Sequence, residues 1–171
     1  MGSWTVKELA AHTARAFTTI EAYLATPPGD LVVPNAVAYF RRSLADPIVH
    51  EAVAERGRQD AAGLGADPVG SIAISAERVR GIVTTTEDDV VIASAAGGIR
   101  FAEYLRTRTL ELTVHTTDLC AAIDLDEEPP EVAADVAMSL LGGLAAAHPR
   151  RGDILRALTG RADLDELNLL G

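Results

Sequence analysis

The stretch RTRTLELTVHTTDL, residues 106–119, is the segment around which the fold and the chemistry of this chain are organised. Read as a helix, it places Glu111 and His115 on one face, with Asp118 close to that face one turn later. Apolar residues fill much of the remaining circumference, and a carboxylate and an imidazole are costly to bury there without a partner. A divalent metal such as zinc is one partner. A core histidine beside a surface glutamate is the alternative that the spacing leaves open.

The composition indicates a single helical domain over residues 1–171. The chain is long enough for a substantial core, and 48% of its residues are hydrophobic but only 4% are aromatic. Alanine, valine and leucine must therefore fill the core, which favours closely packed helices. The formal net charge of −10 argues against binding to nucleic acid or to an anionic membrane surface.

Cysteine usage and the apolar runs indicate a cytoplasmic protein. The single cysteine, Cys120, excludes an internal disulfide and fits a reducing compartment. We see no basic start followed by an apolar segment, and the longest apolar runs are far shorter than a membrane span. Cys120 lies five residues beyond His115, which turns its side chain away from the face of Glu111 and His115. We therefore exclude this thiol from the site.

The first predicted helix contributes a second imidazole. Thr5 and Glu8 have the spacing of a capping box, and apolar residues then recur at helical spacing as far as Leu24. Trp4, just before the cap, is expected to pack back on the first turn. His12 lies on a mostly apolar flank, so we expect it to be at least partly buried. Taken alone, it is best explained as a core imidazole that is hydrogen-bonded to a neighbour.

Further helices and a small β-hairpin are predicted along the rest of the chain. Two Asp-Pro pairs look like a helix cap followed by a first-turn proline, and a β-prone run is followed by a turn at Ala96-Gly97-Gly98. In the last third, Gly142-Gly143 inside a helical segment allows close approach of another helix or marks a kink. The predicted elements are helices that begin at Asp46-Pro47 and at Asp67-Pro68, a hairpin of residues 90–93 and 99–101, and helices at about 102–123, 131–147 and 153–159.

Three residues are the candidate metal ligands: His12 from an early helix, and Glu111 and His115 from one turn of a later helix. Three protein ligands with an open fourth position describe a catalytic zinc site rather than a closed structural one. Asp118 is expected to orient His115 or a bound water from outside the ligand set. No Gly-x-Ser-x-Gly, Walker or GxGxxG pattern occurs, so the sequence offers no competing hydrolase triad or phosphate loop.

Three segments carry a resemblance to a known family. WTVKELAAH (residues 4–12) has the form W-T-x6-H, and YLRTRTLELTVHTTDL (residues 104–119) has the form Y-L-x-x-R-x-x-E-x-x-V-H-x-x-D-L. Both are similar to motifs of the mycothiol-dependent maleylpyruvate isomerase N-terminal domain family, within the DinB-like metalloprotein superfamily. ALTGR (residues 157–161) resembles a short segment near the end of such domains. The motifs keep their order over nearly the whole chain.

The resemblance implies a four-helix up-down-down-up bundle with a divalent metal, usually zinc, bound at one end by His12, Glu111 and His115. It also implies a thiol cofactor, mycothiol, and an actinobacterial cytosol. Such a metal would bind and acidify the thiol, whose thiolate then adds to an electrophile. Family members usually carry a further helix before the W-T motif. We therefore expect that one bundle helix is missing, or is supplied by a later segment or another chain.

The sequence is compatible with three functions. The first is a metal- and thiol-dependent transferase or isomerase that acts on a small electrophile. The second is a non-catalytic metal- or partner-binding bundle, in which formation of a homodimer would cover exposed apolar surface. The third is metal-assisted hydrolysis, for which Asp118 or Glu111 would have to act as the base.

Overall fold

The computed structural model describes residues 4–45, 48–163 and 167–170, and this part of the chain is mainly helical. Seven helices and a small three-stranded sheet occur in it, which confirms the predicted fold class. None of these helices has the combined length and apolarity that crossing a bilayer would need. The elements in chain order are α1 (Val6–Leu24), β1 (Leu31–Val33), α2 (Ala36–Ser43), α3 (Ile48–Gly63), α4 (Pro68–Thr85), β2 (Val91–Ser94), β3 (Gly97–Arg100), α5 (Phe101–Ala122), α6 (Glu131–Ala147) and α7 (Arg151–Leu158).

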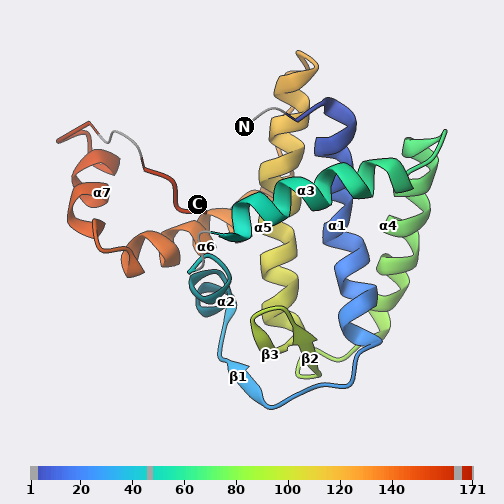
Figure 1. The fold of residues 1–171 in the computed structure, drawn as a ribbon. Coiled ribbons are helices and arrows are strands. Elements are labelled where there is room, and N and C mark those ends of the chain that lie inside the picture. The colour runs from blue at the N-terminus through green and yellow to red at the C-terminus, as the bar shows by residue number, and fades with distance from the viewer. Residues whose placement is uncertain (1–3, 46–47, 164–166, 171) are drawn as a thin grey trace.

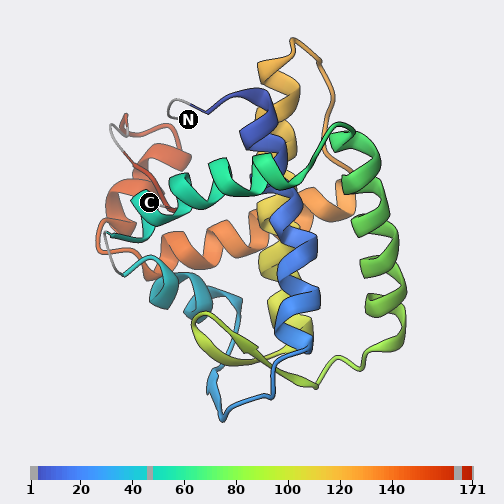
Figure 2. The same ribbon diagram turned by 45° about the vertical axis from the view of Figure 1, so that its right-hand side comes forward.

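The antiparallel pair α1 and α5 forms the centre of the fold. In Figure 1, α1 and α4 run down the molecule, α5 runs back up, and α3 crosses in front of them. Figure 2 shows α6 crossing behind α5, with which it packs. The down, down and up order of the lengthwise helices is compatible with the predicted bundle. Because α1 and α5 are antiparallel, the beginning of α1 lies beside the end of α5.

Local signals explain where the helices begin. The Thr5 hydroxyl accepts a hydrogen bond from the Glu8 backbone N–H, and the Glu8 carboxylate accepts one from the Thr5 backbone, so the capping box is confirmed. Asp67 caps α4 by accepting from the backbone N–H of Gly70, as its Asp-Pro signal predicted. The corresponding signal at Asp46-Pro47 lies outside the described residues. The helices predicted at 102–123, 131–147 and 153–159 occur as α5, α6 and α7, with boundaries shifted by no more than two residues.

The sheet confirms the predicted hairpin but corrects its turn and adds a strand. Strands β2 and β3 pair antiparallel, with Ser94 opposite Gly97, so the turn is formed by Ala95 and Ala96. Gly97 and Gly98 therefore lie in β3, and their prediction as turn residues is wrong. The third strand, β1, pairs parallel with β3 and was not predicted, because its partner lies far away along the chain.

Replacement of Gly98 by alanine is expected to destabilise the fold by roughly 1–3 kcal/mol, because the new Cβ would collide with the backbone carbonyl oxygen of Asp30. The backbone of Asp30 directly precedes the paired strand β1, so its carbonyl oxygen cannot rotate away as a flexible side chain can. Gly142→Ala is the matched control, since a Cβ there meets nothing within 4 Å. In the middle of α6 it is expected to stabilise by up to about 1 kcal/mol. Urea unfolding measures both, and equal midpoints for the two variants would refute the proposed collision.

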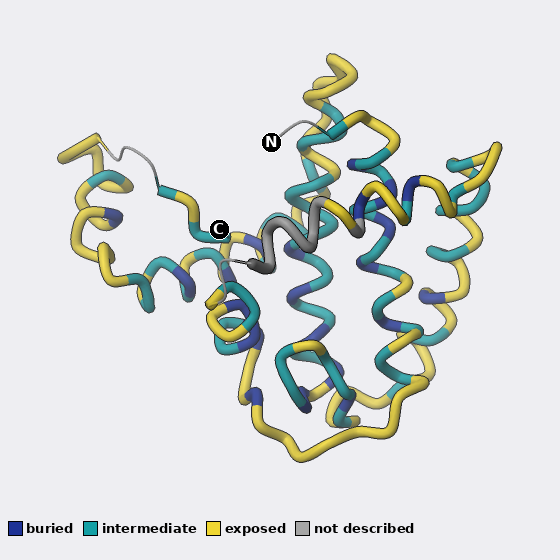
Figure 3. Tube along the Cα trace, in the orientation of Figure 1, coloured by how far each residue is buried: buried dark blue, intermediate teal, exposed yellow. Residues whose placement is uncertain are grey.

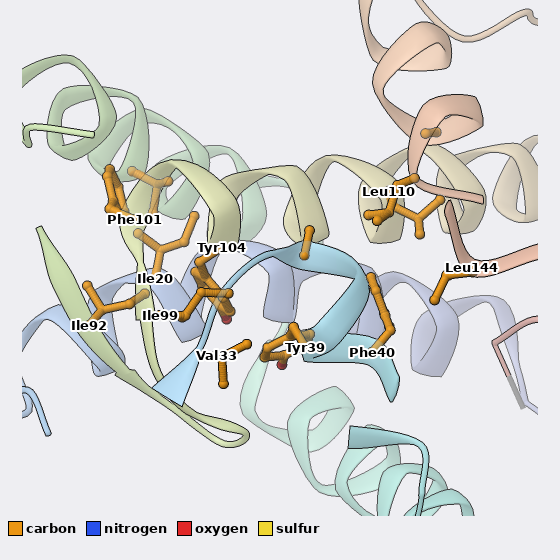
Figure 4. Packing of buried hydrophobic residues seen from close by; sticks show 14 residues of the cluster. Ile20, Val33, Tyr39, Phe40, Ile92, Ile99, Phe101, Tyr104, Leu110 and Leu144 are labelled. Atoms are coloured by element: carbon orange, nitrogen blue, oxygen red, sulfur yellow. The ribbon is translucent and has the colours of Figure 1, made fainter. Parts of the chain in front are cut away.

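The core lies between α1, α2, α5, α6 and the sheet. Figure 3 shows buried residues along the facing sides of the central helices, and Figure 4 shows the side chains that meet there. Phe101, Tyr104 and Leu110 of α5 are each fully shielded from solvent. Gly143 of α6 lies so close to α2 that a Cβ would be 2.7 Å from Val37 Cγ2, which confirms the predicted close approach of another helix. The core therefore holds α5 in a fixed position against α1 and α2.

Candidate metal centre

The α1–α5 pair brings His12, Glu111 and His115 together. One ligand atom from each residue lies within 4.8 Å of the other two, and all three side chains are partly buried. In the described part of the chain this is the one group of histidine, cysteine and carboxylate side chains with such a spacing. Neighbouring ligands of a tetrahedral zinc ion lie roughly 3.4 Å apart, given bonds of about 2.0–2.2 Å. Small side-chain rotations would therefore suffice to surround an ion. Cys120 is not part of the group, in agreement with its predicted position.

His115 lies between two carboxylates of its own helix. Its Nε2 is 3.2 Å from Glu111 Oε2, and its Nδ1 is 3.4 Å from Asp118 Oδ2. The His115 side chain is 18% exposed and that of Glu111 is 24% exposed, so both are largely shielded from solvent. Asp118 thus stands where the spacing placed it, behind the imidazole and on the side away from Glu111. This contact restricts rotation of the ring and leaves Nε2 directed at the cluster.

The charges of the cluster favour an ionised Glu111 beside a protonated His115. Burial would raise the pKa of Glu111, but the hydrogen bond from His115 and the nearby Arg108 charge outweigh burial and lower it. Burial would likewise lower the pKa of His115, but Glu111 and Asp118 outweigh this effect and raise it. The surroundings of Glu111 and His115 therefore stabilise positive charge between the two side chains, which is also what a bound cation requires.

His12 differs from His115, because it is held neutral. Burial, followed by repulsion from the His115 charge, lowers the pKa of His12 to about 4. Its Nδ1 is buried and has no hydrogen-bond partner in the described part of the chain, so the expected satisfied core imidazole is not found at this atom. A neutral imidazole with an unused buried nitrogen is costly, and neutral imidazole is the form that binds metal ions. The donor set of two imidazoles and one carboxylate therefore fits a divalent ion.

Trp4 covers one side of His12. The two ring centroids are 4.7 Å apart, and the His12 and His115 rings are also 4.7 Å apart in an edge-on arrangement. On its other side, Trp4 lies against α3, where a Cβ at Gly57 would be 3.3 Å from the indole ring. The sequence placed Trp4 on the first turn of α1. Its reach to His12 and to α3 was missed, because that contact depends on how α3 crosses α1.

Arg108 is a second residue that the sequence analysis missed. It lies one turn before Glu111 on α5, and its guanidinium carbon is 4.8 Å from the centre of the Tyr104 ring and 5.7 Å from that of Tyr39. Its charge helps to keep Glu111 ionised. The i, i+3 spacing of Arg108 and Glu111 is visible in the sequence, but the stacking on a tyrosine from α2 is not.

Fold and site together define a class of protein: a mainly helical bundle whose central antiparallel helices hold a His/Glu/His cluster with the chemistry of a metal site. The model of the mycothiol maleylpyruvate isomerase N-terminal domain family matches residues 1–120, and the chain belongs to this family. The match includes the whole cluster and ends two residues before the end of α5, so α6 and α7 lie beyond it. No curated protein and no solved structure matches the chain.

Proposed function

We propose that this protein binds a divalent metal ion, zinc in the first instance, through His12, Glu111 and His115. We propose further that it is a thiol-dependent transferase or isomerase that acts on a small electrophile, with mycothiol as the thiol, in an actinobacterial cytoplasm. The observation that carries the proposal is the convergence of the three donor atoms within 4.8 Å. Membership of a mycothiol-associated family supports the choice of thiol.

The residues of the chain have separate tasks in this proposal. The three donors leave one position of a tetrahedral ion open. When bound, zinc supplies a positive charge that lowers the pKa of a thiol at that position. Asp118 holds the His115 ring in the orientation that directs Nε2 at the site. Trp4 shields the His12 side from water, and Arg108 keeps Glu111 in the ionised form that binds cations.

Metal analysis followed by a thiol test decides the proposal. The purified protein is expected to bind about one zinc ion per chain, and a cobalt-loaded sample is expected to develop a thiolate-to-cobalt absorption band when thiol is added. Turnover of a panel of small electrophiles is then measured with and without mycothiol. Failure to bind zinc, nickel or cobalt would overturn the proposal, and turnover that needs no thiol would replace it with metal-assisted hydrolysis.

Trp4 gives an independent report on where the ion binds. It is the only tryptophan in the chain, and its ring lies 4.7 Å from that of His12. Copper or nickel bound at the cluster is therefore expected to quench the tryptophan fluorescence in a saturable titration. An ion that binds with unchanged fluorescence occupies another part of the protein, which would contradict the assignment of these three ligands.

Asp118→Asn is expected to weaken zinc binding by about 10–100-fold, the usual cost of losing a carboxylate that orients a metal-binding histidine. The asparagine keeps the shape of the side chain but removes the charge behind His115. Asp135→Asn on the exposed face of α6 removes the same charge away from the site and serves as the control. Competition with a coloured chelator measures both affinities. Equal affinities would mean that Asp118 does not hold the imidazole.

Zinc affinity is expected to fall as the pH is lowered, by about tenfold per pH unit below the pKa of His115. That pKa is raised above the ordinary value of 6.5 by Glu111 and Asp118, so the proton already competes with zinc near neutrality. His12, with a pKa of about 4, contributes no competing proton in this range. Calorimetry at pH 6 to 8 in buffers of different protonation enthalpy counts the released protons. An affinity independent of pH would contradict the exchange of a proton for the metal.

A second candidate function is partner binding, including formation of a homodimer. A shallow apolar groove of about 260 Å³ runs between α5 and α6, and Met138 at its edge is 66% exposed. Val132, on the same helix, is 77% exposed. Tight metal binding without thiol-dependent turnover would favour this function. A monomer in light scattering would contradict the homodimer.

A further inference from the structure

Arg108 holds a guanidinium group at the base of the candidate metal centre. The side chain stacks on Tyr104 and Tyr39, and its Nε donates a hydrogen bond of 3.0 Å to the Thr107 hydroxyl. Tyr104 and Thr107 are fully buried, and Tyr39 is 7% exposed. These contacts come from two helices, α2 and α5, so they fix the position of the guanidinium rather than leaving it free to move into solvent.

Among the described residues, the two terminal nitrogens of Arg108 have no hydrogen-bond or ion-pair partner. No carboxylate oxygen of the described residues forms an ion pair with them, and the one hydrogen bond of this guanidinium uses Nε. These nitrogens are also absent from the fully buried unpaired atoms of the structure, so they keep some contact with solvent. Several other arginines in the same part of the chain do pair with a carboxylate, namely Arg15, Arg58, Arg78, Arg80 and Arg106.

The groups that surround this guanidinium are neutral. Burial raises the pKa of the Tyr104 hydroxyl, whose neighbour is Thr19 of α1, so this phenol stays protonated. Burial likewise raises the pKa of Tyr39, whose neighbour is Ser43 at the end of α2. A shielded guanidinium whose terminal N–H groups have no acceptor among the described residues is costly in the free protein. An anion that accepted hydrogen bonds from these N–H groups would remove that cost.

We propose that Arg108 binds a carboxylate group of the small molecule that reacts at the metal centre, which makes it a specificity-determining residue. The role of Arg108 in a reaction rests on the proposed function, but the binding of an anion by Arg108 does not require the metal. A planar carboxylate matches the two parallel N–H groups of a guanidinium.

A titration of the metal-free protein tests anion binding at Arg108 separately from metal binding. The Nε–H signal of Arg108 in a nitrogen-15 spectrum, assigned by its loss in Arg108→Lys, is followed during titration with malonate at constant ionic strength. A saturable shift is expected with malonate and none with malonamide, its neutral analogue. Arg80→Lys is the control, because Arg80 is exposed and paired with Glu77, and it is expected to leave the titration unchanged. An Arg108 signal that ignores malonate, or follows malonamide equally, overturns the inference.

Zinc-loaded protein then tests whether the anion site and the metal act on one ligand. We expect 3-mercaptopropionate to bind at least about tenfold more tightly than 3-mercaptopropanamide, since a charge-assisted bond is lost in the amide. This ratio is expected to approach one in Arg108→Gln and to recover in part in Arg108→Lys. Equal affinity of both thiols in the unmodified protein refutes the role of Arg108. If neither thiol binds but malonate shifts the Arg108 signal, the proposed function fails while the carboxylate site stands.

Discussion

His115→Ala is expected to reduce zinc affinity by more than about 100-fold, a larger loss than the removal of an orienting residue causes. His115 is one of three donors, and its Nε2 faces Glu111 across the space where an ion would be held. With alanine at this position, His12 and Glu111 alone must bind the ion, and two ligands leave half of a tetrahedral shell to water. Chelator competition measures the affinity, and fluorescence of Trp4 reports whether the remaining ion is still close to His12.

His148→Ala is the matched control for this prediction. His148 is the C-cap residue of α6, where its Nδ1 accepts a hydrogen bond from the backbone of Arg150. It is also a histidine, but it is not part of the cluster. Its removal is expected to leave zinc binding unchanged. Similar losses in both variants would mean that histidines bind zinc without regard to the site. Full retention of zinc by His115→Ala would remove the basis of the proposed function.

Leu110→Ala is expected to destabilise the protein by about 2–5 kcal/mol, because Leu110 is completely buried and its removal leaves a cavity among packed side chains. For a chain of this length, such a loss corresponds to a fall in melting temperature of roughly 5–15 °C. Leu110 directly precedes Glu111, but it points into the core and offers no metal ligand. The folded variant is therefore expected to bind zinc with nearly the affinity of the unmodified protein.

Leu155→Ala is the control for Leu110→Ala, because it truncates the same type of side chain at an exposed position. Leu155 lies on α7 with 64% of its surface exposed, so truncation is expected to change the stability by less than about 0.5 kcal/mol. Thermal unfolding of the metal-free proteins measures both variants. A large loss at Leu155, or a negligible one at Leu110, would contradict the packing of the core. Leu110→Ala and His115→Ala thus test stability and metal binding separately on one helix, α5.

The helices could be predicted from the sequence because their signals are local. The Thr5 and Glu8 capping box, the Asp67 cap and the apolar periodicity all act within a few residues. Glu111, His115 and Asp118 belong to this group as well, since four-residue and three-residue spacings within one helix fix which side chains meet. The cluster on α5 is therefore readable from the chain alone.

The sheet could not be predicted in full, because its pairing depends on segments that are distant in the sequence. Strand β1 has only three residues and forms its hydrogen bonds with β3, so nothing in its own sequence reveals the partner. The turn was misplaced for a related reason. Gly97 and Gly98 look like turn residues, but Gly98 is needed inside β3, where the backbone of Asp30 leaves no room for a Cβ. A glycine required by a distant segment looks the same as a glycine required by a turn.

The amino-acid sequence by itself determined the helical class, most helix boundaries and the three ligand candidates, His12 and the pair Glu111 and His115 that shares one turn of α5. Only the tertiary structure decided that His12 comes within 4.8 Å of them, that Trp4 covers its ring, and that no carboxylate of the described residues pairs with Arg108. The physical reason is the range of the forces involved. Capping and helical periodicity act between residues a few positions apart. The surroundings of His12, Trp4 and Arg108 depend instead on how the core packs α1, α2 and α3 around α5.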